Sequence, residues 1–264
     1  MNVRYFPGCT LKTTAKELDR LTRAAAKALG ITLIEPENWQ CCGGVFVTAT
    51  DEIASKLSAV RALVDARDAG QPLVSVCSAC HNVLRQTNHA MRTDPVFADR
   101  VNRYLGLEQP YTGETKVLHF LELLRDEIGF DALRQAVKNP LTRQKVAAYY
   151  GCLLLRPSEA MGMDDPENPC ILEDCIRALG AEPVIYPRRN ECCGGYVAIE
   201  DPESAAKKSR AVLESAGSRQ ADRLVTACPL CRYNLEKHGD GTLPVAYFTD
   251  LLAEALGIKE ANTP

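Results

Sequence analysis

A block of five cysteines occurs twice in this chain of 264 residues. In each block a Gly-Cys pair comes first, a Cys-Cys-Gly-Gly segment follows, and a Cys-x-x-Cys motif closes it. The blocks consist of Cys9, Cys41, Cys42, Cys77 and Cys80, and of Cys152, Cys192, Cys193, Cys228 and Cys231. The last four cysteines of the second block each lie 151 positions after their counterparts, and the first lies 143 positions after, so the second copy has eight extra residues in its first loop. Five cysteines that match in order and nearly in register indicate an internal duplication.

The segments around the cysteines repeat as well. Short apolar runs typical of strands are followed by segments of helical period. The predicted strands are 3–6, 31–34, 73–76 and 117–120 in the first copy and 145–150, 183–186, 224–226 and 245–248 in the second. The predicted helices are 18–29, 51–68 and 121–128, and 171–179, 202–220 and 250–256. Both copies have Ala-Leu-Gly at a helix end, which is typical of glycine at the C′ position.

Strands that alternate with helices predict parallel sheets joined by crossover helices. We therefore expect an α/β fold of two pseudo-symmetric half-domains, each a small, mainly parallel sheet with flanking helices. We place the halves at residues 1–138 and 139–264, because Lys138-Asn139-Pro140 interrupts the pattern. Residues 88–115 are predicted to be an insertion in the first copy, since the second copy has only a short Gly-Asp-Gly turn at 239–241.

The cysteines of each block follow predicted strands. In a parallel sheet the loops beyond the carboxyl ends of the strands share one edge, and ligands bind there. Residues that are 70 positions apart in the sequence can therefore meet. The sequence predicts one five-cysteine site in each half.

Three kinds of site are compatible with these cysteines. A structural zinc needs four ligands, and Cys-x-x-Cys is a common half of such a site. An iron–sulfur cluster is also held by thiolates, and it can use a fifth thiolate on a second iron. We favour clusters, because adjacent cysteines such as Cys41 and Cys42 cannot easily aim both sulfurs at one small ion. Zinc in place of a cluster in one of the halves stays an open alternative. Disulfides are the least favoured, because the N-terminus lacks a signal-peptide pattern and we expect a cytoplasmic protein, where thiols stay reduced.

Composition excludes other classes of protein. The net charge of −3 is not the strongly basic charge that is typical of nucleic-acid-binding proteins. No apolar run approaches the ~20 residues that span a bilayer, so an integral membrane protein is not expected. The chain contains neither a Gly-x-Gly-x-x-Gly dinucleotide motif nor a compact four-cysteine ferredoxin run.

The doubled pattern, with Tyr5-Phe6-Pro7-Gly8-Cys9 at its start and two Cys-Cys-Gly boxes, resembles the catalytic B subunit of heterodisulfide reductase, the founding family of the CCG cysteine-rich domain. The resemblance covers nearly the whole chain. It implies a noncubane [4Fe–4S] cluster in each block, with all ten block cysteines as ligands. It also implies a ferredoxin-like iron–sulfur subunit and a flavin-bearing subunit as partners, and a disulfide as substrate, cleaved to two thiols between the clusters. Relatives with CCG domains also serve as electron-transfer subunits of other oxidoreductases, and that non-catalytic role is the alternative.

A few residues outside the blocks attract attention. His81 follows Cys80, and an imidazole there could supply a proton for disulfide reduction, although a simple polar residue in a first helical turn is the plainer interpretation. Lys12, Arg188, Arg189 and Arg232 could offset negative charge at a cluster or lie in solvent, and Trp39 could screen the first site or simply pack. Cys175 is expected to fill the core and Cys170 to lie at the surface or a helix start, so neither is counted as a ligand. His89, His119 and His238 fall outside any motif, and His119 matches Tyr247 in the other copy.

Overall fold

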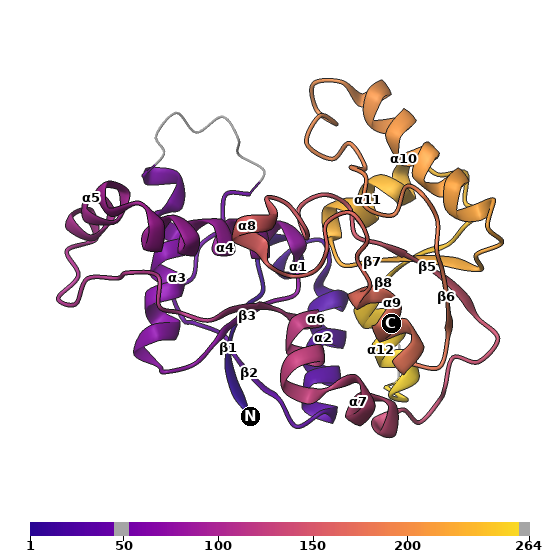
Figure 1. Ribbon diagram of the computed structural model, residues 1–264, viewed down its shortest axis with the longest axis horizontal. Coiled ribbons are helices and arrows are strands. Elements are labelled where there is room, and N and C mark those ends of the chain that lie inside the picture. Colours follow the sequence, from indigo (N-terminus) through magenta and orange to yellow (C-terminus); the bar gives the residue numbers. More distant parts are fainter. Residues whose placement is uncertain (45–52, 259–264) are drawn as a thin grey trace.

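The chain forms two four-stranded parallel sheets in the computed structural model, which describes residues 1–44 and 53–258 (Figure 1). The strand orders are β2-β1-β3-β4 and β6-β5-β7-β8, so the two sheets have the same topology. The strands are β1 (Asn2–Phe6), β2 (Thr32–Ile34), β3 (Leu73–Ser75) and β4 (Val117–His119), then β5 (Lys145–Tyr149), β6 (Glu182–Val184), β7 (Arg223–Thr226) and β8 (Val245–Tyr247). All pairings are parallel. The predicted α/β class, with one parallel sheet in each half, is confirmed.

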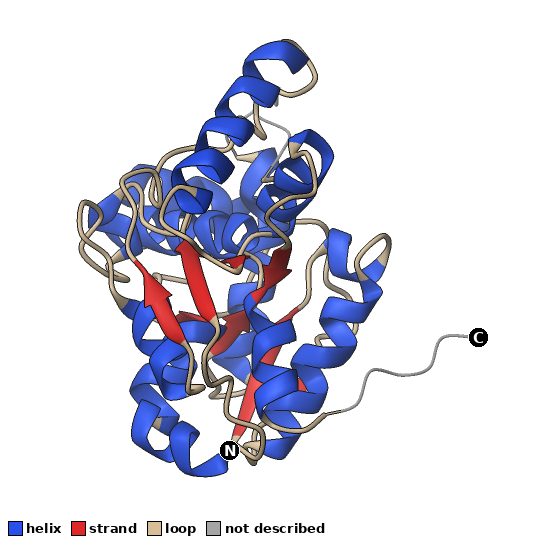
Figure 2. Cartoon of the chain, turned by 90° about the vertical axis from the view of Figure 1, so that its right-hand side faces the viewer, coloured by secondary structure: helices blue, strands red, loops and turns tan. Residues whose placement is uncertain are grey.

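Helices cover both faces of the sheets (Figure 2). Such strands are buried on both sides, which is why β5 is a continuous apolar run from Val146 to Tyr149. The helices are α1 (Cys9–Lys12), α2 (Lys16–Ala28), α3 (Leu57–Asp68), α4 (Ser78–Thr93), α5 (Pro95–Leu105), α6 (Phe120–Glu122), α7 (Phe130–Ala136), α8 (Ser158–Met161), α9 (Ile171–Ala178), α10 (Pro202–Gly217), α11 (Pro229–His238) and α12 (Phe248–Ala255). A 3₁₀ turn, Ala54–Lys56, precedes α3, and a π-helical segment, Leu123–Ile128, extends α6.

The predicted helix ends match the backbone. Gly30 and Gly180 follow α2 and α9 with φ of 74° and 89°, the left-handed conformation that glycine adopts without strain. Asp201 caps α10 by accepting a hydrogen bond from the Ser204 N–H at 2.9 Å. Two predictions differ in detail. The predicted helix 121–128 is mostly π-helical. Of the predicted helix 51–68, the α-helix begins only at Leu57 after the 3₁₀ turn, and residues 51 and 52 lie outside the described residues.

Helices from both halves fill the space between the two sheets (Figure 1). Helix α2 packs against α12, and α6 packs against α9. Side chains of both halves, Leu18 and Leu251 among them, belong to one hydrophobic core. The segment that joins the halves is held against the end of α12, because the N–H groups of Lys138 and Asn139 both donate to the Ala255 carbonyl at 2.9 Å. The domain boundary at this point stays a prediction.

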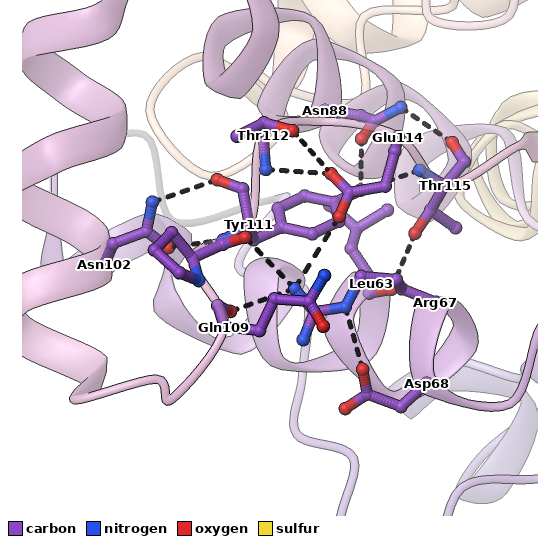
Figure 3. A network of polar contacts seen from close by, with 11 residues as sticks. Leu63, Arg67, Asp68, Asn88, Asn102, Gln109, Tyr111, Thr112, Glu114 and Thr115 are labelled. Atoms are coloured by element: carbon purple, nitrogen blue, oxygen red, sulfur yellow. Dashed lines mark hydrogen bonds and ion pairs between the residues drawn. The ribbon is translucent and has the colours of Figure 1, made fainter.

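The insertion of the first copy consists of the end of α4, α5 and a loop that Tyr111 anchors (Figure 3). The Tyr111 ring is fully buried, its hydroxyl donates to Asn88, and its backbone N–H and C=O pair with the Asn102 side chain at 2.9 Å each. Arg67 donates to the Gln109 carbonyl at 3.0 Å. The polar residues of this segment therefore serve to tie the loop to α3, α4 and α5.

Candidate metal centres

The cysteines of each half lie at the carboxyl ends of three neighbouring strands. Cys9 begins α1 directly after β1, Cys41 and Cys42 follow β2, and Cys77 and Cys80 connect β3 to the first turn of α4. The second half repeats this arrangement after β5, β6 and β7. The parallel topology thus places each set at one sheet edge, as the sequence predicts.

The five thiols of each set form a chain in which each thiol lies near the next. In the first set the Cys9 and Cys41 sulfurs are 3.6 Å apart, and those of Cys42 and Cys80 are 3.3 Å apart. Cys41 also lies near enough to Cys42, and Cys77 near enough to Cys80, for one thiol to shift the pKa of the other.

The second set is connected in the same order. The Cys193 and Cys231 sulfurs are 3.5 Å apart. Cys152 and Cys192, Cys192 and Cys193, and Cys228 and Cys231 lie near enough for one thiol to shift the pKa of the other. All ten of these cysteines are free thiols.

Exposure divides each set in the same way. Cys42, Cys77 and Cys80 are buried, whereas Cys9 and Cys41 are exposed. In the second half Cys193, Cys228 and Cys231 are buried, whereas Cys152 and Cys192 are partly exposed. Each set therefore has a buried part and an accessible part, and the accessible part consists of the leading cysteine and the first member of the Cys-Cys pair.

Close packing of the sulfurs changes their acidity. Hydrogen bonding from the Cys80 thiol, more than any other contact, lowers the pKa of Cys42 to about 7. In the second set, hydrogen bonds from Cys152 and Cys193 lower the pKa of Cys192. In the second set the pKa of Cys228 is lowered as well, chiefly by the Cys231 thiol. The thiolate is the form that binds a metal, and each set thus favours thiolate before any metal arrives.

Glycines allow the backbone to approach these sulfurs. A Cβ atom on Gly8 would lie 2.6 Å from the Cys80 sulfur, and one on Gly151 would lie 3.1 Å from the Cys231 sulfur. In the Cys-Cys-Gly-Gly loops, the N–H groups of Gly43 and Gly194 donate to Cys41 and Cys192 at 3.5 and 3.3 Å. Only glycine fits at Gly8, where φ is also +77°.

The donor set fits an iron–sulfur cluster. Each half offers five thiols, with a backbone N–H group directed at one of the sulfurs, and such hydrogen bonds tune clusters. Within residues 1–44 and 53–258, no three His, Cys, Asp or Glu side chains form a group suited to one metal ion.

Buried polar side chains join the two sites across the seam between the halves. Ser78, directly after Cys77, donates through its N–H and its hydroxyl to the Ala227 carbonyl, at 3.1 and 2.7 Å. The Ala79 N–H lies near enough to the Cys228 sulfur of the other half to help lower its pKa. The two Cys-x-x-Cys motifs are thus in direct contact.

Tyr196 makes a second connection, which the sequence did not lead us to expect. Its hydroxyl donates to the Gly44 carbonyl and so links the two Cys-Cys-Gly-Gly loops. Burial raises the pKa of Tyr196 to about 12, and the nearby thiols Cys152, Cys228, Cys42 and Cys77 add to that rise. The hydroxyl therefore lies among sulfurs of both sets. The available signal was a departure from the repeat, because the first copy has Val45 at this position.

His81 is completely buried behind the first site. Its Nε2 atom lies 3.3 Å from a Glu122 carboxylate oxygen, and its ring contacts the His119 ring edge-on. Burial lowers the pKa of His81 well below its ordinary value, so the ring is neutral near pH 7. Its role as a proton donor stays a prediction.

The four cations that the sequence analysis named are all paired. Lys12 contacts Glu35 at 2.7 Å, and Glu35 also accepts from Trp39 Nε1 at 2.7 Å. Arg188 pairs with Glu191, Arg189 is buried against Asn168 and Glu173, and Arg232 pairs with Glu236 and Asp250. The Trp39 ring packs edge-on against Phe6, at 5.3 Å between centroids.

The two remaining cysteines lie apart from the sets. Cys175 is buried in the core on α9, as expected for a small apolar side chain. Cys170 is exposed at the start of α9, with its sulfur 3.9 Å from Asp164. Both placements agree with the expectations from the sequence.

Comparisons with known proteins identify the repeat. The family model described as CCG, cysteine-rich domain, matches residues 3–85 and 146–236. The membrane anchor subunit of 8-methylmenaquinol:fumarate reductase from Wolinella succinogenes is 32% identical, over 96% of this chain and 92% of that protein. The B subunit of a ferredoxin/F(420)H(2)-dependent CoB-CoM heterodisulfide reductase from Methanosarcina acetivorans is 28% identical, over 96% of this chain and 89% of that protein.

A solved structure has the same fold. A hypothetical protein from Helicobacter pylori matches with a TM-score of 0.77 at 11% identity, and the match covers 98% of this chain and 49% of that one. In the described part of this chain, the helices are too short or too polar to cross a bilayer. The two family matches, the doubled cysteine sets and the relatives named as B subunits of heterodisulfide reductases agree: the chain belongs to the CCG family of cysteine-rich domain proteins.

Proposed function

We propose that the chain is the disulfide-reducing subunit of a heterodisulfide-reductase-like complex, with one noncubane [4Fe–4S] cluster in each five-cysteine set. The observation that carries the proposal is the pair of equivalent thiol chains, joined through the Tyr196 hydroxyl and the Ser78–Ala227 contacts. Cleavage of a disulfide releases two sulfur atoms, and each of them needs a site that can bind it. Two matched sites side by side supply one position for each.

The ligands would be the ten block cysteines. A cluster in each set supplies one electron at a time and an iron that can bind sulfur. The overall reaction breaks the S–S bond of the substrate and forms two S–H bonds, with two electrons from a partner and two protons from the medium. No other oxidant or reductant is needed.

The residues of the chain prepare both sites for this chemistry. The buried thiols anchor each site, and the accessible pairs, Cys9 with Cys41 and Cys152 with Cys192, are the sides that a small substrate can approach. The Gly43 and Gly194 N–H groups stabilise negative charge on sulfur. The Tyr196 hydroxyl holds the two Cys-Cys-Gly-Gly loops together.

We further propose a ferredoxin-like iron–sulfur subunit and a flavin-bearing subunit as partners, in the cytoplasm. The chain has no ferredoxin cysteine run and no dinucleotide motif, and its relatives are named as subunits of reductases. Its twelve free thiols are compatible with a reducing compartment.

A second candidate function is that of an iron–sulfur electron-transfer subunit without disulfide chemistry. The observation that favours it is the similarity to a fumarate reductase subunit at 32% identity. That relative is named for a different reaction, and the same sites would then pass electrons only.

Metal analysis tests the proposal first. The chain is purified anaerobically, and iron and acid-labile sulfide are measured; we expect about eight iron per chain. Cys193→Ser should remove about half of that iron, whereas Cys175→Ser, an equally buried cysteine outside the sets, should leave it unchanged. About two zinc per chain without iron would contradict the proposal.

Turnover then separates the two functions. The purified complex is given reduced viologen and a small disulfide, and the release of thiols is followed. Release that depends on both cysteine sets supports the reductase. Full iron loading without thiol release supports the electron-transfer subunit.

A further inference from the structure

Helix α4 and its counterpart α11 differ in what covers them. Both helices begin directly after the first cysteine of a Cys-x-x-Cys motif, and their residues correspond at a spacing of 151 positions. Asn82 of α4 thus corresponds to Tyr233 of α11, and His81 corresponds to Arg232. The pseudo-symmetry allows one half to serve as a template for the other.

The loop with eight extra residues covers α4. The Asn82 side-chain amide donates to the carbonyls of Leu153 and Arg156, at 2.8 Å each. Arg85 donates to the carbonyl of Met161 at the end of α8, and the Met161 side chain is fully buried. Figure 1 shows α8 beside α4. The cover is therefore a short helical turn that offers carbonyl oxygens and one apolar side chain.

Helix α11 lies beside an open cavity instead. The loop after Cys9 is shorter, and a cavity of about 350 Å³ lies between α1, α2 and α11. It is lined by Thr10, Thr14, Leu18, Leu21, Pro229 and Tyr233, among others. Tyr233 is 57% exposed, whereas its counterpart Asn82 is 4% exposed. We call this cavity the α11 groove.

The base of the groove repeats a feature that is buried in the first half. There, His81 lies 3.3 Å from Glu122, whose side chain is 4% exposed and accepts from the His119 N–H. In the α11 groove, Arg232 contacts Asp250 at 2.9 Å, and Asp250 accepts from the Tyr247 N–H. The Arg232 side chain is 29% exposed. The same arrangement of helix, capping carboxylate and basic side chain is covered in one half and accessible in the other.

We propose that the α11 groove is the docking site for a short helical turn of a partner subunit, which covers α11 as α8 covers α4. The inference rests on the proposed function, because that function requires a partner. The turn presents a backbone carbonyl to Arg232 and an apolar side chain to Tyr233, Leu18 and Leu21. It is uncharged, because an acidic turn would meet Glu17, Glu236 and Asp250. A basic turn would compete with Arg20 for Glu17 and with Arg232 for the other two carboxylates.

Site-specific photo-crosslinking in the intact complex tests the proposal. Tyr233 is replaced by p-benzoylphenylalanine in the tagged chain, the complex is purified and irradiated, and the crosslinked peptide is sequenced by mass spectrometry. The matched control carries the same replacement at Tyr104, another exposed tyrosine, on α5. We expect position 233, and not position 104, to crosslink to one short apolar segment of a subunit that co-purifies in stoichiometric amount.

The inference would be overturned if position 233 formed no crosslink in an intact complex, which is expected if a small molecule occupies the groove. A crosslink to a second copy of this chain, or to a strongly charged segment, would also overturn it. An affinity measurement adds an independent check. Tyr233→Glu should raise the dissociation constant for the partner at least ~10-fold, which corresponds to ~1.4 kcal/mol, whereas Tyr104→Glu should not. Equal affinities for the two variants would also overturn it.

Iron analysis keeps the two proposals distinguishable. Iron per chain should be the same in the wild type and in Tyr233→Glu, since the side chain is exposed and is not a ligand. A wild-type chain without iron refutes the proposed function whatever the crosslink shows. A fully loaded chain that fails to crosslink at position 233 refutes only the docking site.

Discussion

His119 and Tyr247 stand at equivalent positions of the two halves, and both side chains contact the carbonyl oxygen of Val76. His119 Nε2 lies 3.0 Å from it, and the Tyr247 hydroxyl donates to it and also to the Ala227 carbonyl at 2.9 Å. Val76 and Ala227 directly precede Cys77 and Cys228, so these contacts hold the two cysteine sites against each other. The histidine and the tyrosine at this repeat position thus both stabilise the contact between the two halves.

Tyr247→Phe should destabilise the protein. The hydroxyl is fully buried, and its removal leaves two buried carbonyls with one partner fewer. We expect the free energy of unfolding to fall by about 1–3 kcal/mol, measured by urea denaturation. Tyr104→Phe, at an exposed tyrosine, should change it by less than about 0.5 kcal/mol. Equal effects of the two substitutions would contradict a structural role of the seam.

His119 should make the protein less stable in acid. Burial lowers the pKa of His119 to about 3, whereas an unfolded histidine titrates near pH ~6.5. Between those values the unfolded state binds one more proton, so stability is complete above pH ~6.5 and falls as the pH decreases toward 3. Each pH unit within this window should cost up to about 1.4 kcal/mol.

The test compares the wild type with His119→Gln by denaturation at pH 7, 6 and 5. The variant should show a shallower decline, while His81, buried in both proteins, contributes the same slope to each. Parallel pH profiles would show that folding does not lower the pKa of His119.

Gly8→Ala should empty the first site selectively. The new Cβ would lie 2.6 Å from the Cys80 sulfur, so the backbone or the thiol must move. We expect iron to fall from about eight to about four per chain. Gly30→Ala is the matched control, because Gly30 has nearly the same φ, 74°, but no atom within 4 Å of the added carbon. If both variants lose iron equally, backbone strain and not the contact with sulfur is responsible.

Tyr196→Phe should slow the turnover of the disulfide without changing the iron content. The substitution removes the hydrogen bond to Gly44 but none of the thiols. A lost hydrogen bond of about 1 kcal/mol predicts a roughly five-fold slower release of thiols from the disulfide, with iron content unchanged. Tyr104→Phe, at an exposed tyrosine on α5 that bonds to neither loop, is the control for kinetic assays of the complex. Unaltered turnover in Tyr196→Phe would exclude a positioning role.

Much of this architecture follows from the sequence alone. The spacing of the cysteines reveals the duplication, and alternating apolar and helical segments predict parallel sheets whose carboxyl edges gather each set of five. Local rules also predict the glycine ends of α2 and α9 and the Asp201 cap, because caps depend on residues within a few positions of one another.

The tertiary structure alone decided how the halves meet. Tyr196, Ser78 and Tyr247 act on carbonyls more than 140 positions away, and no periodicity reports such pairs. His81 is neutral because the folded chain buries it completely, whereas Arg232 at the same repeat position remains partly exposed. The sequence by itself determined the two sets of thiols, because their spacing relative to the strands and helices is a local property. The packing of one half on the other determined the environment that the two sets share, because burial depends on residues distant in the chain.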